Sequence, residues 1–156
     1  MVTPLPETTV DAATELDVLQ AKAQFSIRVD GIEPKISADG RLELRGARHP
    51  LLTGKAVPVD VLLIPPVSVL VITGPNTGGK TVALKTAGLH VLMAQAGLFV
   101  PAEAGSRLPV FRSVFADIGD EQSIAANLST FSSHIRNIVE MSKALELPAL
   151  VLLDEA

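Results

Sequence analysis

The residues best suited to chemistry lie in the run GPNTGGKT, from Gly74 to Thr81. They follow the pattern G-x-x-x-x-G-K-[ST], in which glycines let backbone N–H groups approach a polyphosphate closely and the next helix adds its positive end. Lys80 would reach the β- and γ-phosphates, and Thr81 would place a hydroxyl on Mg²⁺. A chance glycine-rich turn is the alternative, but average residue frequencies produce this pattern in under about one per cent of chains this long. The predicted phosphate-binding residues are Gly74, Pro75, Asn76, Thr77, Gly78, Gly79, Lys80 and Thr81.

A second chemical feature is the acidic pair that follows the apolar run ALVLL, at Asp154 and Glu155. A phosphate site needs a carboxylate to hold Mg²⁺, and hydrolysis also needs a base that accepts a proton from water. Asp154 comes 74 residues after Lys80, which leaves room for a helix, a strand and a further helix between them. Two acids at a strand end are ordinary surface residues by themselves, but beside a phosphate loop they predict a metal ligand, Asp154, and a general base, Glu155.

The elements that must position these residues alternate along the second half of the chain. An almost continuous run of β-branched residues predicts a strand that is buried on both faces. The helix predicted after it begins and ends at glycines. Two more apolar runs predict strands, with an amphipathic helix between them. Strand, helix, strand, helix and strand indicate parallel α/β layering. The predicted elements are a strand at 67–73, a helix from about Gly79 to Ala96 that Gly97 ends, a strand within 109–118, a helix at 129–147 and a strand at 149–156.

The first half of the chain has weaker signals. Residues 1–13 are rich in Pro and Thr and predict a loose lead-in. From Thr14, a possible N-cap, helical spacing of apolar residues up to Phe25 predicts the end of a helix whose packing partners are elsewhere. The alternating run 41–46 predicts an edge strand with solvated arginines.

Composition limits the class of protein. The chain has 156 residues, of which 47% are hydrophobic, so a folded core is expected. Its formal net charge of −4, scattered basic residues and absence of Trp and Tyr disfavour a nucleic-acid groove in this segment. The absence of Cys excludes disulfides and thiolate metal sites, and there is no signal-peptide pattern. Asp60 and prolines interrupt the longest apolar stretch, 56–73, so we expect no membrane span and a cytoplasmic location.

Four runs together carry a resemblance to a known family: TGPNTGGKT, FADIGDEQSI, LSTFSSHI and ARHPLL. They look like the ATPase domain of the MutS family and, more narrowly, its second, recombination-suppressing branch, the MutS-two proteins. The resemblance extends from about Leu16 to the end. It implies a P-loop NTPase fold of the ABC type, with a mainly parallel sheet flanked by helices. It also implies that residues 1–25 end an upstream lever or connector helix, and that residues 26–156 form the N-terminal part of the ATPase domain.

The resemblance implies further site residues. ABC-type ATPases place a glutamine that senses Mg²⁺ and water about where Gln122 lies, and a helix that caps the γ-phosphate of the opposite subunit about where Ser129 lies. The alternative for Ser129 is a simple N-cap, which is compatible with that contact. The segment after RHP lies against adenine in the family, which by position implies Val57 and Pro58. ATP, Mg²⁺ and a homodimer with two composite sites are the implied cofactors and assembly. Lys80, Gln122 and Glu155 are the implied catalytic residues.

The chain also departs from the family pattern. The family continues past the acidic pair with GxGTDP and a switch histidine, whereas this chain stops at Ala156, where Leu is usual. We expect the chain alone to hydrolyse ATP poorly and to dimerise weakly. We expect His90 and His134 to lie in the core or on a helix surface, and His49 to have a structural role.

Three functions stay open at this point. The first is the ATPase module of a MutS-two-like protein acting on branched DNA or stalled ribosomes through other regions, with a possible endonuclease domain outside this chain. The second is a mismatch-repair MutS ATPase, which the GDEQSI run disfavours. The third is a nucleotide-binding fragment without turnover.

Overall fold

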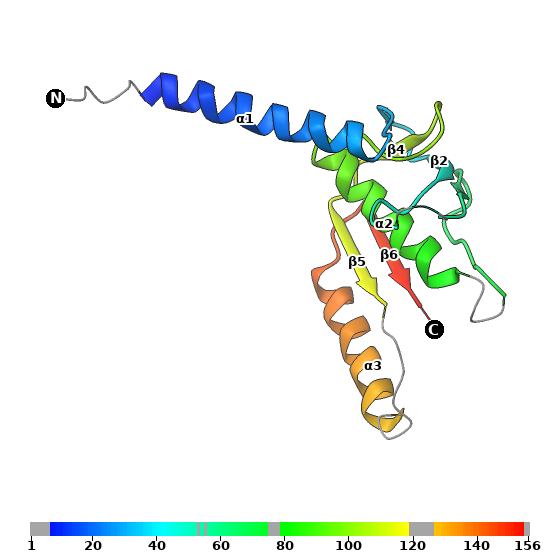
Figure 1. Cartoon of the computed structure of the whole chain (residues 1–156). Coiled ribbons are helices and arrows are strands. Elements are labelled where there is room, and N and C mark those ends of the chain that lie inside the picture. Colours follow the sequence, from blue (N-terminus) through cyan, green and yellow to red (C-terminus); the bar gives the residue numbers. More distant parts are fainter. Residues whose placement is uncertain (1–6, 53, 55, 75–78, 119–126, 155–156) are drawn as a thin grey trace.

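The computed structural model describes residues 7–52, 54, 56–74, 79–118 and 127–154. The chain folds as a mixed α/β unit with a long first helix that stands out from it (Figure 1). The elements in order are α1 (Glu7–Arg28), β1 (Lys35–Ser37), β2 (Leu42–Ala47), β3 (Val59–Leu63), α2 (Lys80–Gln95), β4 (Arg107–Pro109), β5 (Ser113–Asp117), α3 (Asn127–Ala144) and β6 (Ala149–Leu153).

The strands form two separate sheets. The first has the order β1-β4-β2-β3, in which β1 and β4 are parallel and β2 runs antiparallel to both of its neighbours. The second is the parallel pair β5-β6, with Asp117 opposite Leu153 at its end. The expected mainly parallel sheet is therefore wrong for the described residues, because β2 connects directly to β3 and pairs with it in the opposite direction.

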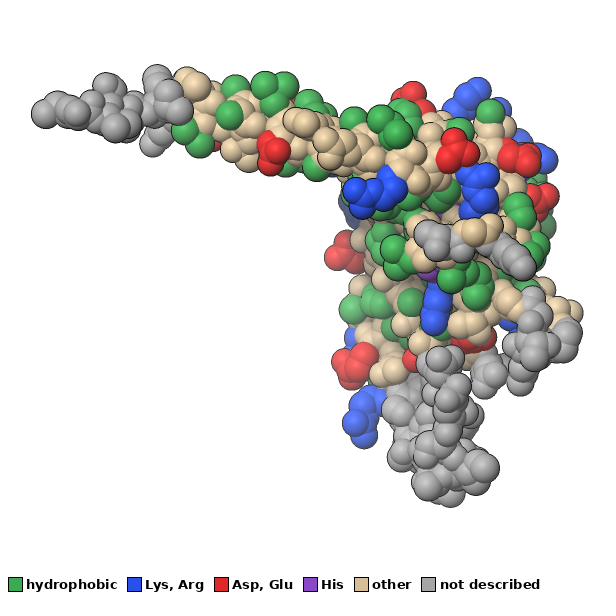
Figure 2. All heavy atoms as spheres, viewed as in Figure 1, with side chains coloured by type: hydrophobic (Ala, Val, Ile, Leu, Met, Phe, Trp, Pro, Cys, Tyr) green, Lys and Arg blue, Asp and Glu red, His purple; other side chains and the backbone are tan. Residues whose placement is uncertain are grey.

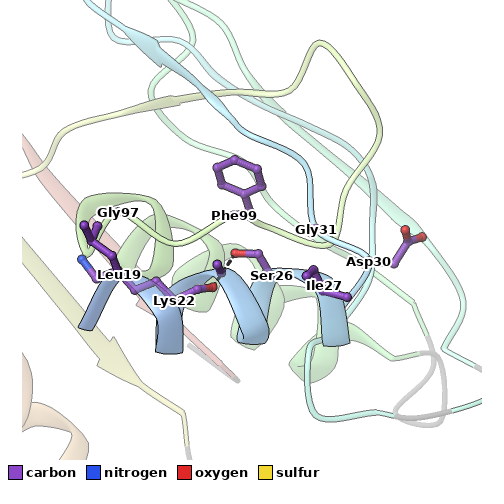
Figure 3. A pocket seen from close by; sticks show the side chains of 9 residues that line it. Leu19, Lys22, Ser26, Ile27, Asp30, Gly31, Gly97 and Phe99 are labelled. Atoms are coloured by element: carbon purple, nitrogen blue, oxygen red, sulfur yellow. Dashed lines mark hydrogen bonds between the residues drawn. The ribbon is translucent and has the colours of Figure 1, made fainter. Parts of the chain in front are cut away.

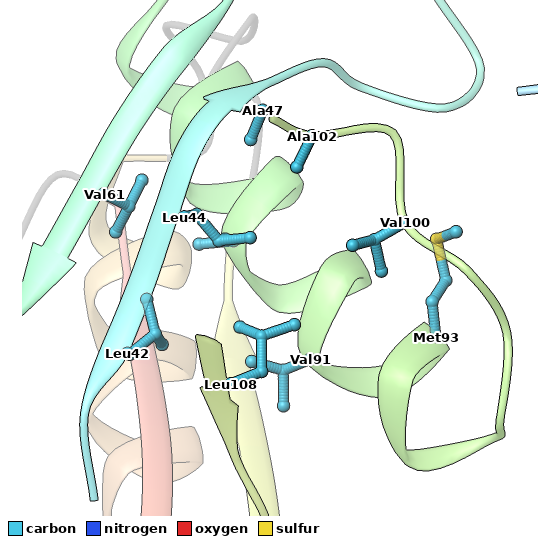
Figure 4. Close-up of a cluster of buried hydrophobic side chains, with 10 residues drawn as sticks. Leu42, Leu44, Ala47, Val61, Val91, Met93, Val100, Ala102 and Leu108 are labelled. Atoms are coloured by element: carbon cyan, nitrogen blue, oxygen red, sulfur yellow. The ribbon is translucent and has the colours of Figure 1, made fainter. Parts of the chain in front are cut away.

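The hydrophobic core lies between the first sheet and α2 (Figure 4). Leu44, Val91, Val100 and Leu108 are fully buried there. Fully burying a side chain of this size contributes about 1.5–3 kcal/mol relative to leaving it exposed. This cluster therefore holds α2 firmly against the first sheet.

Helix α2 has the two glycine boundaries that the sequence predicts. Gly79 is the N-cap residue with φ of 79°, and Gly97 follows the C-cap with φ of 72°. Both angles lie in the left-handed region, which glycine adopts without steric cost. The predicted helix is confirmed, and so are the predictions of α3, β5 and β6.

Helices α2 and α3 lie against opposite faces of the β5-β6 pair. Side chains alternate along a strand, so Leu152 and Asp154 share one face of β6, while Leu153 and its partner Asp117 share the other. Leu152 reaches α2, because a Cβ atom added at Gly88 would lie 2.6 Å from its Cδ1 atom. Asp117 reaches α3 instead, through a hydrogen bond to Asn137.

Three predictions from the first half of the chain need correction. Helix α1 already includes the described residues from Glu7, and Thr14 is no N-cap, because its hydroxyl donates to the Val10 carbonyl within the helix. The run 67–73 forms no strand, and Val69 and Val71 are 73% and 75% exposed, since no described strand pairs with it. Strand β2 is internal rather than at an edge, and β1, β3 and β4 were not predicted.

The far part of α1 makes few contacts with the rest of the described chain. Figure 2 shows it projecting with apolar side chains along its length. Exposed apolar residues of this far part are Val10, Leu16 and Val18. The expectation of a helix whose packing partners lie elsewhere agrees with this exposure.

Candidate functional site

The described ends of the glycine-rich run lie next to the start of α2. Gly74 has φ of 149° and Gly79 has φ of 79°, both in the region that favours glycine. A Cβ atom at either position would meet nothing within 4 Å, so backbone conformation rather than crowding requires glycine there. Pro75, Asn76, Thr77 and Gly78 lie outside the described residues.

Lys80 reaches back to Gly74. Its ammonium group donates a hydrogen bond of 2.9 Å to the Gly74 carbonyl, six residues earlier. The helix begins at the same residue, and its first internal bond joins the Ala83 N–H to the Gly79 carbonyl at 2.9 Å. The positive end of α2 and the Lys80 ammonium therefore point into one region.

Thr81 and Asp154 come together although they are 73 residues apart in sequence. The Thr81 hydroxyl donates a hydrogen bond of 2.5 Å to the Asp154 carboxylate. This contact joins the first turn of α2 to the end of β6, and it connects the two residues that the sequence predicts as metal ligands.

Their chemistry suits Mg²⁺, which prefers oxygen ligands. Mg²⁺ sites commonly combine one or two protein carboxylates with substrate phosphates and water. Among the described residues, no group of three or more His, Cys, Asp and Glu side chains could hold a metal by itself. A site that uses Thr81 and Asp154 together with phosphate oxygens fits this donor set.

A cavity of about 570 Å³ opens at the start of α2, and neither Thr81 nor Asp154 is among the residues that line it. Residues 59–61 of β3, residues 70–74, and Gly79, Lys80 and Ala83 line it. Its volume lies within the usual range of about 300–1,000 Å³ for small-molecule sites. Val59, Val61 and residues 70–72 give the lining apolar surface, Asp60 adds a carboxylate, and Gly74 and Lys80 add polar groups.

Other predicted site residues lie further away or outside the described part. Val57 is 80% exposed, and the cavity lining begins two residues later, at Val59, so neither Val57 nor Pro58 lines it. Gln122 and Glu155 lie outside the described residues. Helix α3 begins at Asn127, so Ser129 lies inside its first turn rather than opening it.

Two further residues stand beside this site, and the sequence reasoning did not select them. The Asp117 carbonyl accepts a hydrogen bond of 3.0 Å from the Asp154 N–H, and the Asp117 carboxylate accepts one of 3.0 Å from the Asn137 amide. The usable signal was the position of Asp117 at the carboxyl end of a strand, because the ends of neighbouring parallel strands meet at one edge.

His90 has a structural place, as expected. It is fully buried in α2, with Nδ1 2.8 Å from the Thr86 carbonyl oxygen and Nε2 3.3 Å from that of Pro101. Burial lowers the pKa of His90, while the two carbonyl contacts oppose that shift. Burial also lowers the pKa of His49, and the nearby positive charge of Lys85 lowers it further.

A second cavity, of about 590 Å³, lies where α1 meets the loop after α2 (Figure 3). Leu19, Ile27 and Phe99 contribute apolar surface to it. The Lys22 ammonium donates a 2.6 Å hydrogen bond to the Ala96 carbonyl at the end of α2. This contact attaches α1 to the core, and the cavity contains none of the predicted site residues.

No helix in the described ranges is long and apolar enough to cross a membrane.

Comparison with known proteins identifies the family. Residues 70–156 match the family model described as MutS domain V. The chain is 57% identical over 146 residues to endonuclease MutS2 of Pelotomaculum thermopropionicum, covering 94% of this chain and 19% of that protein. It is 58% identical over 140 residues to endonuclease MutS2 of Halothermothrix orenii, covering 90% and 18%. The chain spans about a fifth of the length of the curated relatives it matches. It belongs to the MutS family, and its similarity to these proteins supports the MutS2 branch.

Proposed function

We propose that the chain binds ATP with Mg²⁺ and is part of the ABC-type, P-loop ATPase module of a MutS2 protein. The observation that carries this proposal is the Thr81–Asp154 hydrogen bond, because it joins the end of the phosphate-loop pattern to the acidic strand end. Lys80 and the start of α2 lie directly beside that bond. The domain boundaries proposed from the sequence are 1–25 for the connecting helix and 26–156 for the ATPase part.

The residues have distinct roles in this proposal. The Lys80 ammonium exchanges its Gly74 acceptor for phosphate oxygens, and the N–H groups at the start of α2 meet further phosphate charge. Thr81 and Asp154 hold Mg²⁺, which when bound supplies charge neutralisation at the β- and γ-phosphates. The apolar surface of Val59, Val61 and residues 70–72 suits the uncharged part of the nucleotide.

Turnover requires additional groups that we infer from the family resemblance. Glu155 accepts the proton of the attacking water, and Gln122 helps to place that water and Mg²⁺. Ser129 at the start of α3 completes the site of a second subunit, so the active form is a homodimer. Val57 and Pro58 approach the adenine only if the segment before β3 closes over the cavity.

The wider role rests on the relatives. Those proteins are named endonucleases of the MutS2 type, which favours this branch over mismatch-repair MutS. We propose that the whole protein acts on branched or recombining DNA, or on stalled ribosomes, through regions outside this chain.

Isothermal titration calorimetry with ATP and Mg²⁺ tests the proposal. Lys80→Ala should abolish binding, because it removes the positive charge next to the phosphates. Lys143→Ala is a matched control, since Lys143 is exposed on α3 and pairs with Glu140 at 3.0 Å. Equal ATP affinity for Lys80→Ala and the unchanged protein would refute the proposal.

A further inference from the structure

Helix α3 and the short loop after it are attached to β5 at both ends of the strand: Asn137 lies in α3, and Glu146 lies two residues beyond the end of α3. At the start of β5, the Ser113 hydroxyl donates to the Glu146 carbonyl at 2.9 Å and accepts from the Glu146 N–H at 3.2 Å. At the end of β5, the Asn137 amide donates to the Asp117 carboxylate at 3.0 Å. Two separated polar attachments, one from α3 and one from the loop after it, oppose sliding and rotation of the helix on the strand.

The attachment at Asp117 continues to the proposed metal ligand. Asp117 is the last residue of β5 in the ladder with β6, where it lies opposite Leu153. Its carbonyl accepts the N–H of Asp154, the next residue, at 3.0 Å, and the Asp154 carboxylate accepts the Thr81 hydroxyl. The backbone of Asp117 therefore fixes where the Asp154 side chain begins.

Asp117 is in a poor position to be a metal ligand itself. Its side chain shares the face of Leu153 and contacts α3 through Asn137, whereas Asp154 lies on the opposite face with Thr81. The Asn137 hydrogen bond occupies one carboxylate oxygen of Asp117 on the α3 face. The contribution of Asp117 is thus to connect α3 with Asp154.

We propose that Asn137 and Asp117 are positioning residues that make the Mg²⁺ affinity of the site depend on the placement of α3. This inference rests on the proposed function. A change in α3, such as contact of its first turn with a second subunit, would pass through Asn137 and Asp117 to Asp154. Partners that orient metal ligands typically change metal affinity 10–100-fold when they are removed. We expect the lower end here, because Asp117 acts through the backbone of Asp154.

The test measures ATP affinity by calorimetry over a series of Mg²⁺ concentrations and again in EDTA. Asn137→Ala should raise the Mg²⁺ concentration for half-maximal enhancement of binding about 10-fold and leave the affinity in EDTA unchanged. A loss of general structure would weaken both measurements. Ser142→Ala, which removes an exposed hydrogen bond on the same helix, should change neither.

Exchanging the side chains of Asp117 and Asn137 tests whether the hydrogen bond between them is what matters. Asn137→Asp places two carboxylates against each other and should raise the Mg²⁺ requirement more than Asn137→Ala. The double variant Asp117→Asn/Asn137→Asp restores the hydrogen bond with donor and acceptor exchanged, and it should recover most of the loss.

The outcomes separate this inference from the proposed function. If the unchanged protein binds ATP with Mg²⁺ and Lys80→Ala does not, but the Asn137 variants keep the original Mg²⁺ requirement, this inference alone is overturned. Failure of the double variant to recover would also overturn it. If the unchanged protein does not bind ATP, the proposed function is overturned and this inference with it.

Discussion

The two sheets on either side of α2 differ in how completely they are covered. In β2 every residue except Arg45 is buried, whereas in β6 the described burial is confined to Leu152. Val151 and Leu153 of β6 remain 41% and 37% exposed. The first sheet therefore supplies most of the apolar burial, and the second carries the end that holds Asp154.

Helix α2 joins these two regions. Its later turns bury His90 and Val91 in the core, while its first turn places Lys80 at the cavity and Thr81 against Asp154. Because a helix is a stiff element, the core fixes the position of its exposed start. Substitutions in the first sheet should therefore change stability, and substitutions around β6 should change function.

The largest expected effect is on turnover in the site region. Glu155→Gln preserves the shape of the side chain but removes the proton acceptor, so ATP binding should survive while hydrolysis falls about 10²–10⁴-fold. Phosphate release by the intact protein is the measurement. Glu140→Gln makes the same chemical change at an exposed position of α3 and should leave the rate unchanged. An unaltered rate for Glu155→Gln would place the base elsewhere.

The second-largest expected effect is a loss of stability when the buried first sheet is altered. Leu108→Ala should lower the free energy of unfolding by about 2–5 kcal/mol, because it leaves a cavity at a fully buried position. Val71→Ala, at a side chain 75% exposed, should change it by less than about 0.5 kcal/mol. Urea unfolding, monitored by circular dichroism, compares the free energies of unfolding of the two variants. Similar losses for both variants would show that the run 67–73 is part of the packed structure.

The elements that the sequence predicts correctly are those with local signals. Gly79 and Gly97 mark the ends of α2, and the apolar runs within 109–118 and 149–156 contain β5 and β6. Lys80, Thr81 and Asp154 were selected in the same way, because residue type and spacing identify the pattern. The structure brings Thr81 and Asp154 together, while their binding role stays a prediction.

The errors arise where structure depends on distant partners. The run 67–73 has the composition of a strand, but strand formation depends on pairing and packing neighbours that composition does not specify. The sequence predicts strand β2 at an edge because leucines alternate with charged residues in the run 41–46. In the fold Glu43 is nearly buried, with Arg45 and Arg107 guanidinium groups 3.8 and 3.7 Å from its carboxylate. Arg107 is too far along the chain for the sequence to reveal that pairing.

The sequence does not predict a place for Asp117 and Asn137 in the site, for a related reason. Polar residues are common at strand ends and on exposed helix faces, so neither residue type is informative alone. Their relation to Asp154 exists only when β5, β6 and α3 have assembled.

A smaller expected effect is the pH dependence of stability that buried His90 contributes. Because burial lowers the folded-state pKa of His90, the unfolded chain binds more protons between that pKa and about 6.5. Stability should therefore fall as the pH drops through about 6.5 and level off below the folded pKa, with a slope of at most about 1.4 kcal/mol per pH unit from this residue.

Urea unfolding between about pH 5.5 and 7.5 measures this slope. His90→Gln should reduce it, while the Gln amide can still donate to a backbone carbonyl. His49→Gln separates the second contribution, because the pKa of His49 is lowered in the same direction. A slope that is identical in His90→Gln and the unchanged protein would contradict the assignment to His90.

The smallest expected effect tests the contact between the two regions at Gly88. Replacing this glycine with alanine should gain about 1 kcal/mol of helix propensity. The new Cβ atom, however, would lie 2.6 Å from Cδ1 of Leu152, and overpacking costs about 1–3 kcal/mol. A terminal methyl group can shift, but Leu152 is 7% exposed and has little free space, so we expect a net loss of about 1 kcal/mol or less.

Shortening the opposing side chain distinguishes these two contributions. In a Leu152→Val background the clash is relieved, so Gly88→Ala should become stabilising by up to about 1 kcal/mol in urea unfolding. Since Leu152 and Asp154 share one face of β6, Gly88→Ala alone should also move Asp154 from Thr81 and raise the Mg²⁺ requirement for ATP binding slightly. If Gly88→Ala were equally destabilising in both backgrounds, contact with Leu152 would not be what requires glycine at this position.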